Sequence, residues 1–324
     1  MRILGVIVNY RTPGLALDAA RALSRQLDAY PGSGIVLVEN DSPDDSETIL
    51  RQGLAAAPWA ASVRLVPSGR NGGFGFGNNV GIRLGLGQDP PPDLFYFLNP
   101  DAVPDPGVVD ELVAAFRDRP EVGIVGSEIR SFDGRWEPGA FRFPTVQSEV
   151  ESAACFFLVS RWLGGSRVAL SPADGPLSVD WVTGSSMAVR REVFDAIGLF
   201  DEAFFLYFEE VDLCRRAKGA GFEVLHLPAA KVLHKQGAST GVGDHRRRMP
   251  AYWFESRWRY FQKHHGTGYA LGASVGWAAG HLVRQAKETL TRRPTPVAPQ
   301  LLQDFVAHTA RAAWRSPTRR SARS

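Results

Sequence analysis

The chain has 324 residues, of which 44% are hydrophobic and 22% charged; this is the composition of an ordinary globular protein and excludes a collagen-like or an intrinsically disordered chain. Its length suits one large domain with an appendage, or two domains. Its two cysteines, Cys155 and Cys214, have no metal-type spacing and predict no disulfide framework, so we expect a cytoplasmic protein.

The net charge of +3 is unevenly distributed along the chain. Residues 245–324 contain fifteen Lys and Arg and only three acidic residues, a balance of +12. Residues 1–244 then carry 22 basic and 31 acidic residues, a balance of −9. This asymmetry favours a basic appendage that faces an anionic surface, such as the inner face of the cell membrane. Docking of the basic part on the acidic part explains the same numbers, so both interpretations stay open.

The first hundred residues alternate strand-like and helical patterns. Residues 3–8 and 34–38 are continuous apolar runs, as expected for strands buried on both faces. The apolar positions between them recur every four residues and predict a helix. Strand, helix and strand in this order form a βαβ unit, so a mostly parallel sheet is expected. Residues 63–66 and 94–98 are predicted as the third and fourth strands.

A segment rich in glycine and asparagine, residues 70–79, follows the third strand. Its glycine spacing departs from the dinucleotide-binding fingerprint, because the third glycine position falls on Asn78 or Val80. We expect a loop whose backbone approaches a ligand closely, with Asn78 and Asn79 as donors or helix caps.

Asp101 follows the fourth strand almost directly, in the sequence Asn99-Pro100-Asp101. Ligands of open α/β sheets bind beyond the carboxyl ends of the strands, so a carboxylate there suits a divalent cation. The alternative role is the N-cap of a helix predicted over 106–117, but Asp105 is better placed for that.

The middle of the chain is expected to contain a strand over 122–129, irregular or antiparallel strands over 130–180, a strand over 181–189, a helix over 190–197 and two short strands over 223–227 and 231–234. Gly184, Ser185 and Ser186 are small residues beside which a ligand fits. The last short strand ends at His234.

Three carboxylates, Glu209, Glu210 and Asp212, lie within four residues and follow a run of aromatic residues. In a helix, Glu209 and Asp212 share one face, and Asp212 reaches Arg215 or Arg216. Glu210 then points elsewhere, with a raised pKa if it is partly desolvated. The alternative is a helical first turn whose acidic residues merely suit the helix dipole.

The last eighty residues are predicted to be mostly helical. Phe254, Trp258 and Phe261 recur at i, i+4 and i+7, as in an amphipathic helix. Glycines at 272, 276 and 280 allow close contact between helices, either within the chain or in a homodimer. The uncharged run 266–283 is not convincingly transmembrane, and residues 315–324 are expected to be disordered.

Together these motifs resemble glycosyltransferase family 2, the nucleotide-sugar transferases of GT-A fold, and more closely its bacterial rhamnosyltransferase-like branch. The resemblance covers about residues 3–239. It rests on short motifs in the expected order and spacing: Val8-Asn9-Tyr10, Glu39-Asn40-Asp41-Ser42, residues 71–79, Asn99-Pro100-Asp101-Ala102, residues 184–187, residues 200–205, residues 209–214 and His234.

The resemblance implies a GT-A α/β domain over 1–244, with a mostly parallel central sheet flanked by helices, and a helical appendage over 245–324. It implies a nucleotide-sugar site formed by Asn9, Tyr10, Glu39, Asn71, Asn78, Asn79, Asn99 and Asp101. It implies acceptor binding by Gly184, Ser185 and Ser186, a Mn²⁺ or Mg²⁺ site at Asp101 and His234, and catalysis by Glu210 with Glu209 and Asp212.

Three positions depart from the family pattern. Glu39 and Glu210 stand where many members have aspartate, which keeps the charge and lengthens the side chain. Asn99-Pro100-Asp101 replaces the usual Asp-X-Asp, so Asp101 is the sole carboxylate of the motif, and His234 is the expected further ligand.

The predicted function is an inverting sugar transfer, with dTDP-L-rhamnose as the leading donor and a cell-surface glycan or its lipid-linked precursor as acceptor. A cation would absorb charge on the leaving diphosphate, and a carboxylate would deprotonate the acceptor hydroxyl. The alternatives are a UDP-sugar donor or a catalytically silent nucleotide-sugar binder that acts as a scaffold. Nothing in the chain predicts a nucleic-acid partner.

Overall fold

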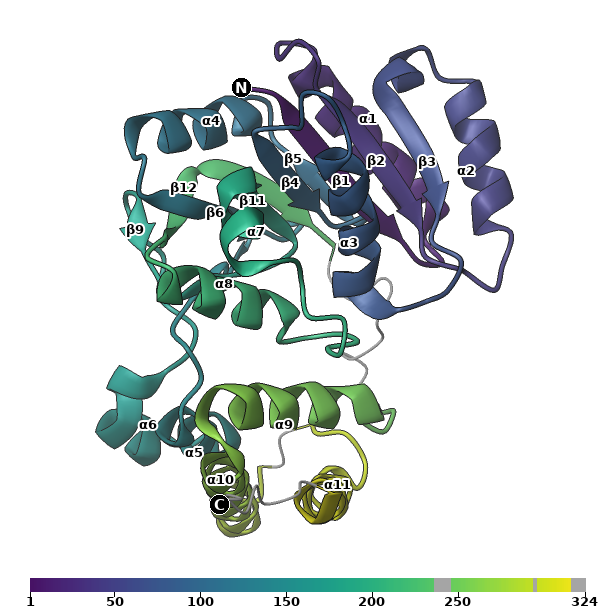
Figure 1. The fold of residues 1–324 in the computed structure, drawn as a ribbon. Helices are drawn as coiled ribbons and strands as arrows, with labels where there is room; N and C mark the ends of the chain where they lie inside the picture. Colours follow the sequence, from purple (N-terminus) through teal and green to yellow (C-terminus); the bar gives the residue numbers. More distant parts are fainter. Residues whose placement is uncertain (236–245, 294–295, 316–324) are drawn as a thin grey trace, which may run out of the picture. The chain divides into compact units, whose positions relative to one another are not determined.

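The computed structural model describes residues 1–235, 246–293 and 296–315 (Figure 1). Contacts between residues divide it into two compact units. The described residues of the first unit are 1–141, 169–205 and 209–235, and those of the second are 142–168, 206–208, 246–293 and 296–315. The second unit therefore contains an internal segment, 142–168, as well as helices of the basic C-terminal part predicted to begin at residue 245.

A ten-stranded sheet forms the centre of the first unit. Its main path runs in the order β3 (Val63–Pro67), β2 (Gly34–Glu39), β1 (Ile3–Asn9), β4 (Leu94–Leu98), β11 (Ser186–Arg190), β6 (Val122–Arg130), β12 (Glu223–His234) and β5 (Ala102–Pro104). Short strands β7 (Trp136–Glu137) and β9 (Leu177–Ser178) pair with β6 and β12, and β8 (Ala140–Phe141) pairs with β10 (Trp181–Val182). Strands β1 to β4 are mutually parallel, as predicted, whereas β11 runs antiparallel between β4 and β6.

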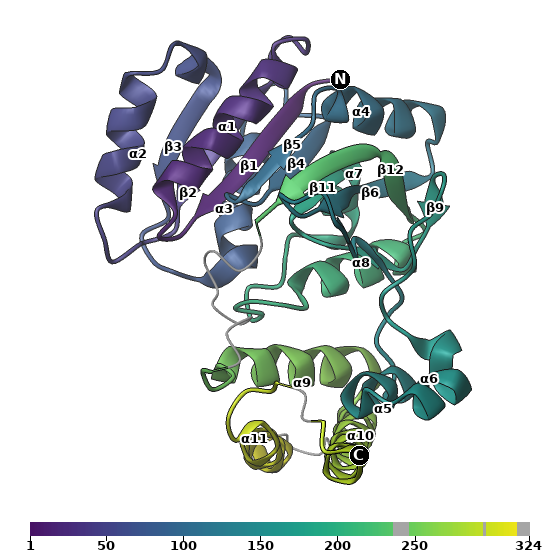
Figure 2. The same cartoon turned by 180° about the vertical axis from the view of Figure 1, so that it is seen from behind.

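Helices cover both faces of this sheet, which Figures 1 and 2 show in turn. The helices are α1 (Pro13–Leu27), α2 (Ser46–Ala55), α3 (Gly73–Leu86), α4 (Val108–Asp118), α7 (Arg191–Ile197) and α8 (Glu209–Gly219), with a short 3₁₀ turn at Pro58–Ser62. Helices α1 and α4 pack on one face, and α3, α7 and α8 on the other.

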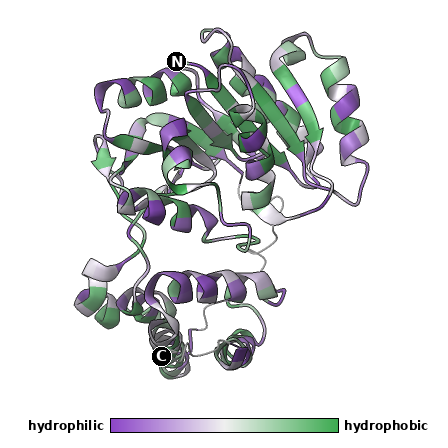
Figure 3. Cartoon of the chain, viewed as in Figure 1, coloured by the Kyte–Doolittle hydropathy of each residue, from purple (hydrophilic) through white to green (hydrophobic). Residues whose placement is uncertain are grey.

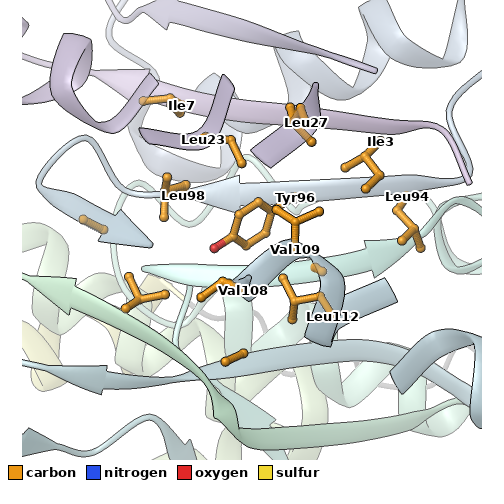
Figure 4. Close-up of a cluster of buried hydrophobic side chains, with 14 of the residues drawn as sticks. Ile3, Ile7, Leu23, Leu27, Leu94, Tyr96, Leu98, Val108, Val109 and Leu112 are labelled. Atoms are coloured by element: carbon orange, nitrogen blue, oxygen red, sulfur yellow. The ribbon is translucent and has the colours of Figure 1, made fainter. Parts of the chain in front are cut away.

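The alternation of side chains along β1 explains the two cores. Ile3 and Ile7 point into the cluster under α1 and α4, whereas Val6 and Val8 point into the cluster under α3. Figure 4 shows the first cluster, where Tyr96 of β4 lies among aliphatic side chains. Because β1, β2 and β4 have helices on both faces, their residues are almost all apolar (Figure 3).

Four local predictions need correction. The glycine and asparagine segment is not a loop throughout, because α3 begins at Gly73. Asp105 does not cap α4 with its side chain, since Gly107 occupies the N-cap position. The two short strands over 223–234 form one strand, β12, with an irregular register between Leu227 and Lys231. Residues 130–180 contain helices as well as short strands.

The second unit is helical: α5 (Val146–Ala154), α6 (Phe157–Leu163), a 3₁₀ turn at Gly164–Ser166, α9 (Ala251–His265), α10 (Thr267–Thr291) and α11 (Leu301–Arg315). Gly276 and Gly280 of α10 lie against α5; a Cβ at Gly280 would come 2.5 Å from the carbonyl oxygen of Val150. A buried ion pair of 2.6 Å joins Arg257 to Glu149. Gly276 and Gly280 thus serve helix packing within this chain, whereas a Cβ at Gly272 would meet no atom within 4 Å.

Among the described residues, no helix is both long enough and apolar enough to cross a membrane. Disorder is predicted for residues 315–324. Of these, only Arg315 belongs to the described part of the chain, and the other residues lie outside it.

Candidate active site

Asn9 ends β1 and is fully buried. Its Oδ1 accepts hydrogen bonds from the backbone N–H and the hydroxyl of Thr12, at 3.2 and 3.3 Å. Its Nδ2 has no hydrogen-bond partner among the described residues. A buried amide donor without a partner costs free energy, so it indicates a position where a ligand group can be bound. Tyr10 is the next residue and is half-buried.

Glu39 ends β2, and its carboxylate shapes the loop that follows. One oxygen accepts from the N–H of Asp41 at 2.9 Å, and the other from the N–H of Ser42 at 3.0 Å. Asp41 has a φ of +58°, an uncommon conformation that these contacts stabilise. Glu39 therefore holds the backbone at the carboxyl end of β2.

Asn40 joins three loops at this edge of the sheet, a role that the sequence did not reveal. Its backbone N–H donates to the Asn9 carbonyl at 2.9 Å, and its Nδ2 donates to Oδ1 of Asn71 and the carbonyl of Gly73, both at 3.2 Å. Its Oδ1 accepts from the Ser68 hydroxyl at 3.2 Å. The ends of β1, β2 and β3 are thereby held together.

Gly73 begins α3 in a conformation that only glycine adopts readily. Its φ is +87°, and a Cβ there would lie 1.7 Å from the carbonyl oxygen of Phe205. That carbonyl accepts a hydrogen bond of 3.0 Å from the N–H of Phe74, and Oδ1 of Asn71 accepts one of 3.1 Å from the N–H of Gly73. The first turn of α3 is thus fixed beside the residues that precede α8 in the chain.

Asn78 and Asn79 are buried inside this arrangement. Nδ2 of Asn78 donates to the carbonyl of Phe74, one turn back, at 3.0 Å. Asn79 donates to the carbonyl of Phe200 at 2.9 Å and to Glu202 at 3.0 Å, and accepts from the N–H of Phe200 at 3.0 Å. Both side chains hold the protein together in this structure, and direct contact with a nucleotide stays a prediction.

Asp101 and His234 lie side by side at the carboxyl end of β4. Nε2 of His234 is 3.1 Å from Oδ1 of Asp101 and 3.3 Å from Nδ2 of Asn99. Both Asp101 and His234 have little exposed surface, with 6% and 13% of their side chains accessible. A carboxylate and an imidazole this close can bind one cation through two protein atoms.

This donor set fits a divalent cation that takes its other ligands from a substrate. Among the residues that the structure describes, no group of three His, Cys, Asp or Glu side chains could hold a metal ion. Asp101 and His234 supply one oxygen and one nitrogen, so oxygen atoms of a bound diphosphate would have to complete the coordination.

The segment Gly184–Ser186 lies between this pair and the acidic helix. The N–H of Asn99 donates to the carbonyl of Ser185 at 2.9 Å, and the position of a Cβ on Gly184 is 3.8 Å from Cβ of Glu210. Ser186 points elsewhere: its hydroxyl is buried within the sheet, 2.8 Å from the Tyr96 hydroxyl and 2.7 Å from that of Ser127. Acceptor binding by its side chain thus remains a prediction.

The three carboxylates of α8 have different surroundings. Asp212 is fully buried and pairs with Arg216 at 2.8 Å, as the helical spacing predicted. Arg216 also donates to the carbonyls of Ile197 and Leu199, both at 2.9 Å. This ion pair therefore fixes α8 to the turn that follows α7.

Glu209 and Glu210 each have a buried Oε2 without a hydrogen-bond partner among the described residues. Burial raises the pKa of Glu210 to about 7. Burial, reinforced by the neighbouring charge of Glu210, raises the pKa of Glu209 well above its usual value. Glu209 lies beside Gly75 of α3, whereas Glu210 lies beside Gly184. The two acids thus face different surroundings, and Glu210 is the one beside the Gly184–Ser185 segment, which is hydrogen-bonded to Asn99.

Comparison with known proteins adds the family to this geometry. Residues 2–252 match the family model described as glycosyltransferase like family 2. The chain belongs to glycosyltransferase family 2. This glycosyltransferase is 33% identical over 248 residues to the N-acetylglucosaminyl-diphospho-decaprenol L-rhamnosyltransferase of Mycobacterium tuberculosis, a match that covers 74% of this chain and 78% of that protein. It is 29% identical over 171 residues to the rhamnosyltransferase WbbL of Escherichia coli, covering 50% and 60%.

Solved structures with little sequence similarity share its fold. The mannosyltransferase PcManGT of Pyrobaculum calidifontis, in complex with GDP-Man and Mn²⁺, matches with a TM-score of 0.54 and 14% identity, over 98% of this chain and 81% of that one. TarS of S. aureus, in complex with UDP-GlcNAc, also has a TM-score of 0.54, with 12% identity over 95% and 79%. The predicted GT-A fold with C-terminal helices is confirmed.

Proposed function

We propose that this glycosyltransferase moves L-rhamnose from dTDP-L-rhamnose to a hydroxyl of a cell-surface glycan or its lipid-linked precursor, with inversion at the transferred carbon. The rhamnosyltransferases of M. tuberculosis and E. coli among its relatives support the sugar. The M. tuberculosis relative is named after N-acetylglucosaminyl-diphospho-decaprenol, a sugar linked to a lipid, and this supports a lipid-linked acceptor.

The observation that carries this proposal is the placement of two chemically different groups along one edge of the sheet. Asp101 and His234 form a candidate cation site, and Glu210 is a half-buried acid with a buried Oε2 and a raised pKa. The Gly184–Ser185 segment lies beside both groups: the Ser185 carbonyl accepts from the N–H of Asn99, whose side chain contacts His234, and Gly184 faces Cβ of Glu210. Sugar transfer from a nucleoside diphosphate needs a group that stabilises charge on the leaving diphosphate, and near it a base for the acceptor hydroxyl.

Asp101 and His234 would hold Mn²⁺ or Mg²⁺, and the nitrogen ligand favours Mn²⁺. When bound, the cation stabilises the negative charge that develops on the leaving diphosphate. Manganese in the solved PcManGT complex supports this choice. The 3.1 Å separation of the two protein atoms suits ligands of one ion, and it keeps both side chains oriented before the donor binds.

Glu210 is the proposed base that removes the proton from the acceptor hydroxyl. A base works best when its pKa lies near the working pH, and burial raises the pKa of Glu210 to about 7. Asp212 is held by Arg216 and is a weaker candidate. Glu209 lies toward α3, beside Gly75, so we assign it to shaping the pocket around Glu210.

The nucleotide is proposed to bind along the carboxyl ends of β1, β2 and β4. Asn9 contributes its unpartnered Nδ2, with Tyr10 beside it, and the backbone shaped by Glu39 and Asn71 forms the wall of the site. Asn78 and Asn79 support this wall from within α3.

Two alternatives remain open: a UDP-sugar donor, or a silent nucleotide-sugar binder that acts as a scaffold. The UDP-GlcNAc complex of TarS, which shares the fold, keeps the first alternative open. A panel of nucleotide sugars tested by thermal shift identifies the donor. Mn²⁺-dependent hydrolysis of that donor then separates an enzyme from a scaffold, because a silent binder would be stabilised without releasing nucleoside diphosphate.

The basic C-terminal part is proposed to attach the protein to the inner face of the membrane, near a lipid-linked acceptor. Dimerisation through the glycines of α10 has less support, since Gly276 and Gly280 contact α5 of the same chain. The domain division at residue 244 also remains a proposal, because residues 142–168 belong to the same compact unit as the C-terminal helices.

A further inference from the structure

Helix α6 carries a cluster of exposed apolar side chains for which the transferase chemistry has no use. Phe157 is 71% exposed, Leu158 54% and Trp162 89%. With 3.6 residues per turn, these three side chains and Arg161 point within about 140° of one another around the helix. Exposing several large apolar side chains together on one face costs free energy in water, so the cluster indicates a surface that contacts a membrane or another apolar partner.

The one charged side chain of α6 is a cation. Arg161 is exposed between Phe157 and Trp162. The nearby carboxylate of Glu151 is buried, where it accepts a hydrogen bond of 2.7 Å from the Ser160 hydroxyl and pairs with Arg167 at 3.5 Å. The outer face of α6 therefore combines apolar and positive groups, which is the pattern of helices that lie in the headgroup region of an anionic bilayer.

Helix α10 extends this surface within the same compact unit. Nζ of Lys287 donates to the carbonyl of Cys155, one of the two residues between α5 and α6, at 2.7 Å. Leu290, which is 85% exposed, follows less than one turn after Lys287, and the exposed Arg292 and Arg293 come next. The end of α10 thus places a further apolar side chain and further cations near the start of α6.

We propose that the outer face of α6, with the end of α10 around Lys287, is the surface that inserts into an anionic phospholipid membrane. The aromatic side chains enter the headgroup region, and the surrounding arginines bind lipid phosphates. This surface is centred on residues 157–162, and the basic C-terminal part contributes to it through the end of α10. The inference rests on the proposed function, because the surface would hold the enzyme at the membrane where a lipid-linked acceptor lies.

The test is flotation of the full-length protein with vesicles made of phosphatidylcholine alone or of equal parts phosphatidylcholine and phosphatidylglycerol. The test variant is the triple replacement Phe157→Ser, Leu158→Ser, Trp162→Ser. Its matched control replaces three exposed apolar residues elsewhere in the second unit, Leu271→Ser, Val275→Ser and Trp314→Ser. We expect the partition coefficient on anionic vesicles to fall roughly tenfold or more in the test variant and to change little in the control.

A second variant separates the ionic from the apolar contribution. Arg161→Glu should weaken binding to the anionic vesicles and leave the weak binding to neutral ones unchanged. The proposal is overturned if wild-type protein does not float with anionic vesicles. It is also overturned if the test variant floats as well as wild type, or if both triple variants lose binding equally.

A separate measurement keeps this inference distinct from the proposed function. Donor hydrolysis without vesicles should be the same in the wild type and in the α6 triple variant, because α6 contributes no residue to the candidate active site. If the wild type shows no sugar transfer but still floats through α6, the proposed function fails and the membrane surface stands.

Discussion

Nε2 of His234 lies 3.1 Å from Oδ1 of Asp101, although 133 residues separate the two in the chain. The contact follows from backbone pairing, because β5 begins at Ala102 and pairs with β12, with Ala102 opposite His234. The N–H of Lys235 also donates to the carbonyl of Asp101 at 3.0 Å. The candidate cation site is thus built on a strand ladder, which is more rigid than a loop.

Asp101→Ala should weaken Mn²⁺-dependent binding of a nucleoside diphosphate roughly tenfold or more. The substitution deletes the only carboxylate of the Asp101–His234 pair. His234→Ala should weaken the same affinity to a smaller extent. Calorimetric titration of nucleoside diphosphate with and without Mn²⁺ measures both effects. Asp105→Ala, a replacement just beyond β5, is the matched control and should bind like wild type. Unchanged Mn²⁺-dependent affinity in Asp101→Ala contradicts the cation site.

Glu210→Gln should reduce turnover by about 10²–10⁴-fold, the usual contribution of a general base. Donor affinity should remain close to wild type, because the substitution keeps the shape of the side chain. Glu209→Gln, the neighbouring control, should reduce turnover much less. Steady-state kinetics of both variants decide the matter. If Glu209→Gln is the inactive variant and Glu210→Gln stays active, the two roles are reversed.

The pH profile should follow the titration of Glu210. Burial raises its pKa to about 7, so the carboxylate is largely protonated at pH 6 and ionised at pH 8. Since a base must be ionised to accept a proton, kcat/KM should rise through about pH 7 and level off above about pH 8. The residual activity of Glu210→Gln should lack this rise. A rise that persists unchanged in that variant assigns the titration to another group.

Helix α8 shows which parts of the site are predictable from the sequence. The pairing of Asp212 with Arg216 depends on spacing along one helix, and it is present as predicted. The role of Asn40 was not predictable, because its partners Asn71 and Gly73 lie more than thirty residues away and meet it only through the sheet. Local patterns identify local contacts, whereas contacts between loops depend on strand order.

Helix α3 illustrates the same limit for the fold. Its first two turns are rich in glycine, which has low helix propensity, and the sequence therefore predicts a loop. In the structure these glycines allow the helix to approach β1: a Cβ at Gly77 would lie 2.6 Å from the side chain of Val8, and one at Gly81 would lie 2.6 Å from Val6. Tertiary packing outweighs propensity here. The four parallel strands, by contrast, follow from their apolar runs.

Glu209→Gln should also stabilise the protein at alkaline pH. The native pKa of Glu209 is raised by burial and by Glu210, so between the unfolded and native pKa values the native state binds more protons than the unfolded state. Stability is therefore lost as pH rises through that window. Melting temperatures should show the variant a few degrees above wild type at pH 8, with the difference shrinking at pH 5. Equal melting curves at both pH values would contradict the raised pKa of the buried Glu209.

Gly73→Ala should disrupt the candidate site through the backbone. At a φ of +87°, the added Cβ would lie 1.7 Å from the carbonyl oxygen of Phe205, which also accepts the N–H of Phe74. Gly69 has a similar φ of +78° but no heavy atom within 4 Å of an added Cβ, so Gly69→Ala measures the conformational cost alone. We expect Gly69→Ala to cost on the order of 1–2 kcal/mol in the free energy of unfolding, and Gly73→Ala clearly more. Urea unfolding measures both, and equal losses would show that the start of α3 can move away from Phe205 at little cost.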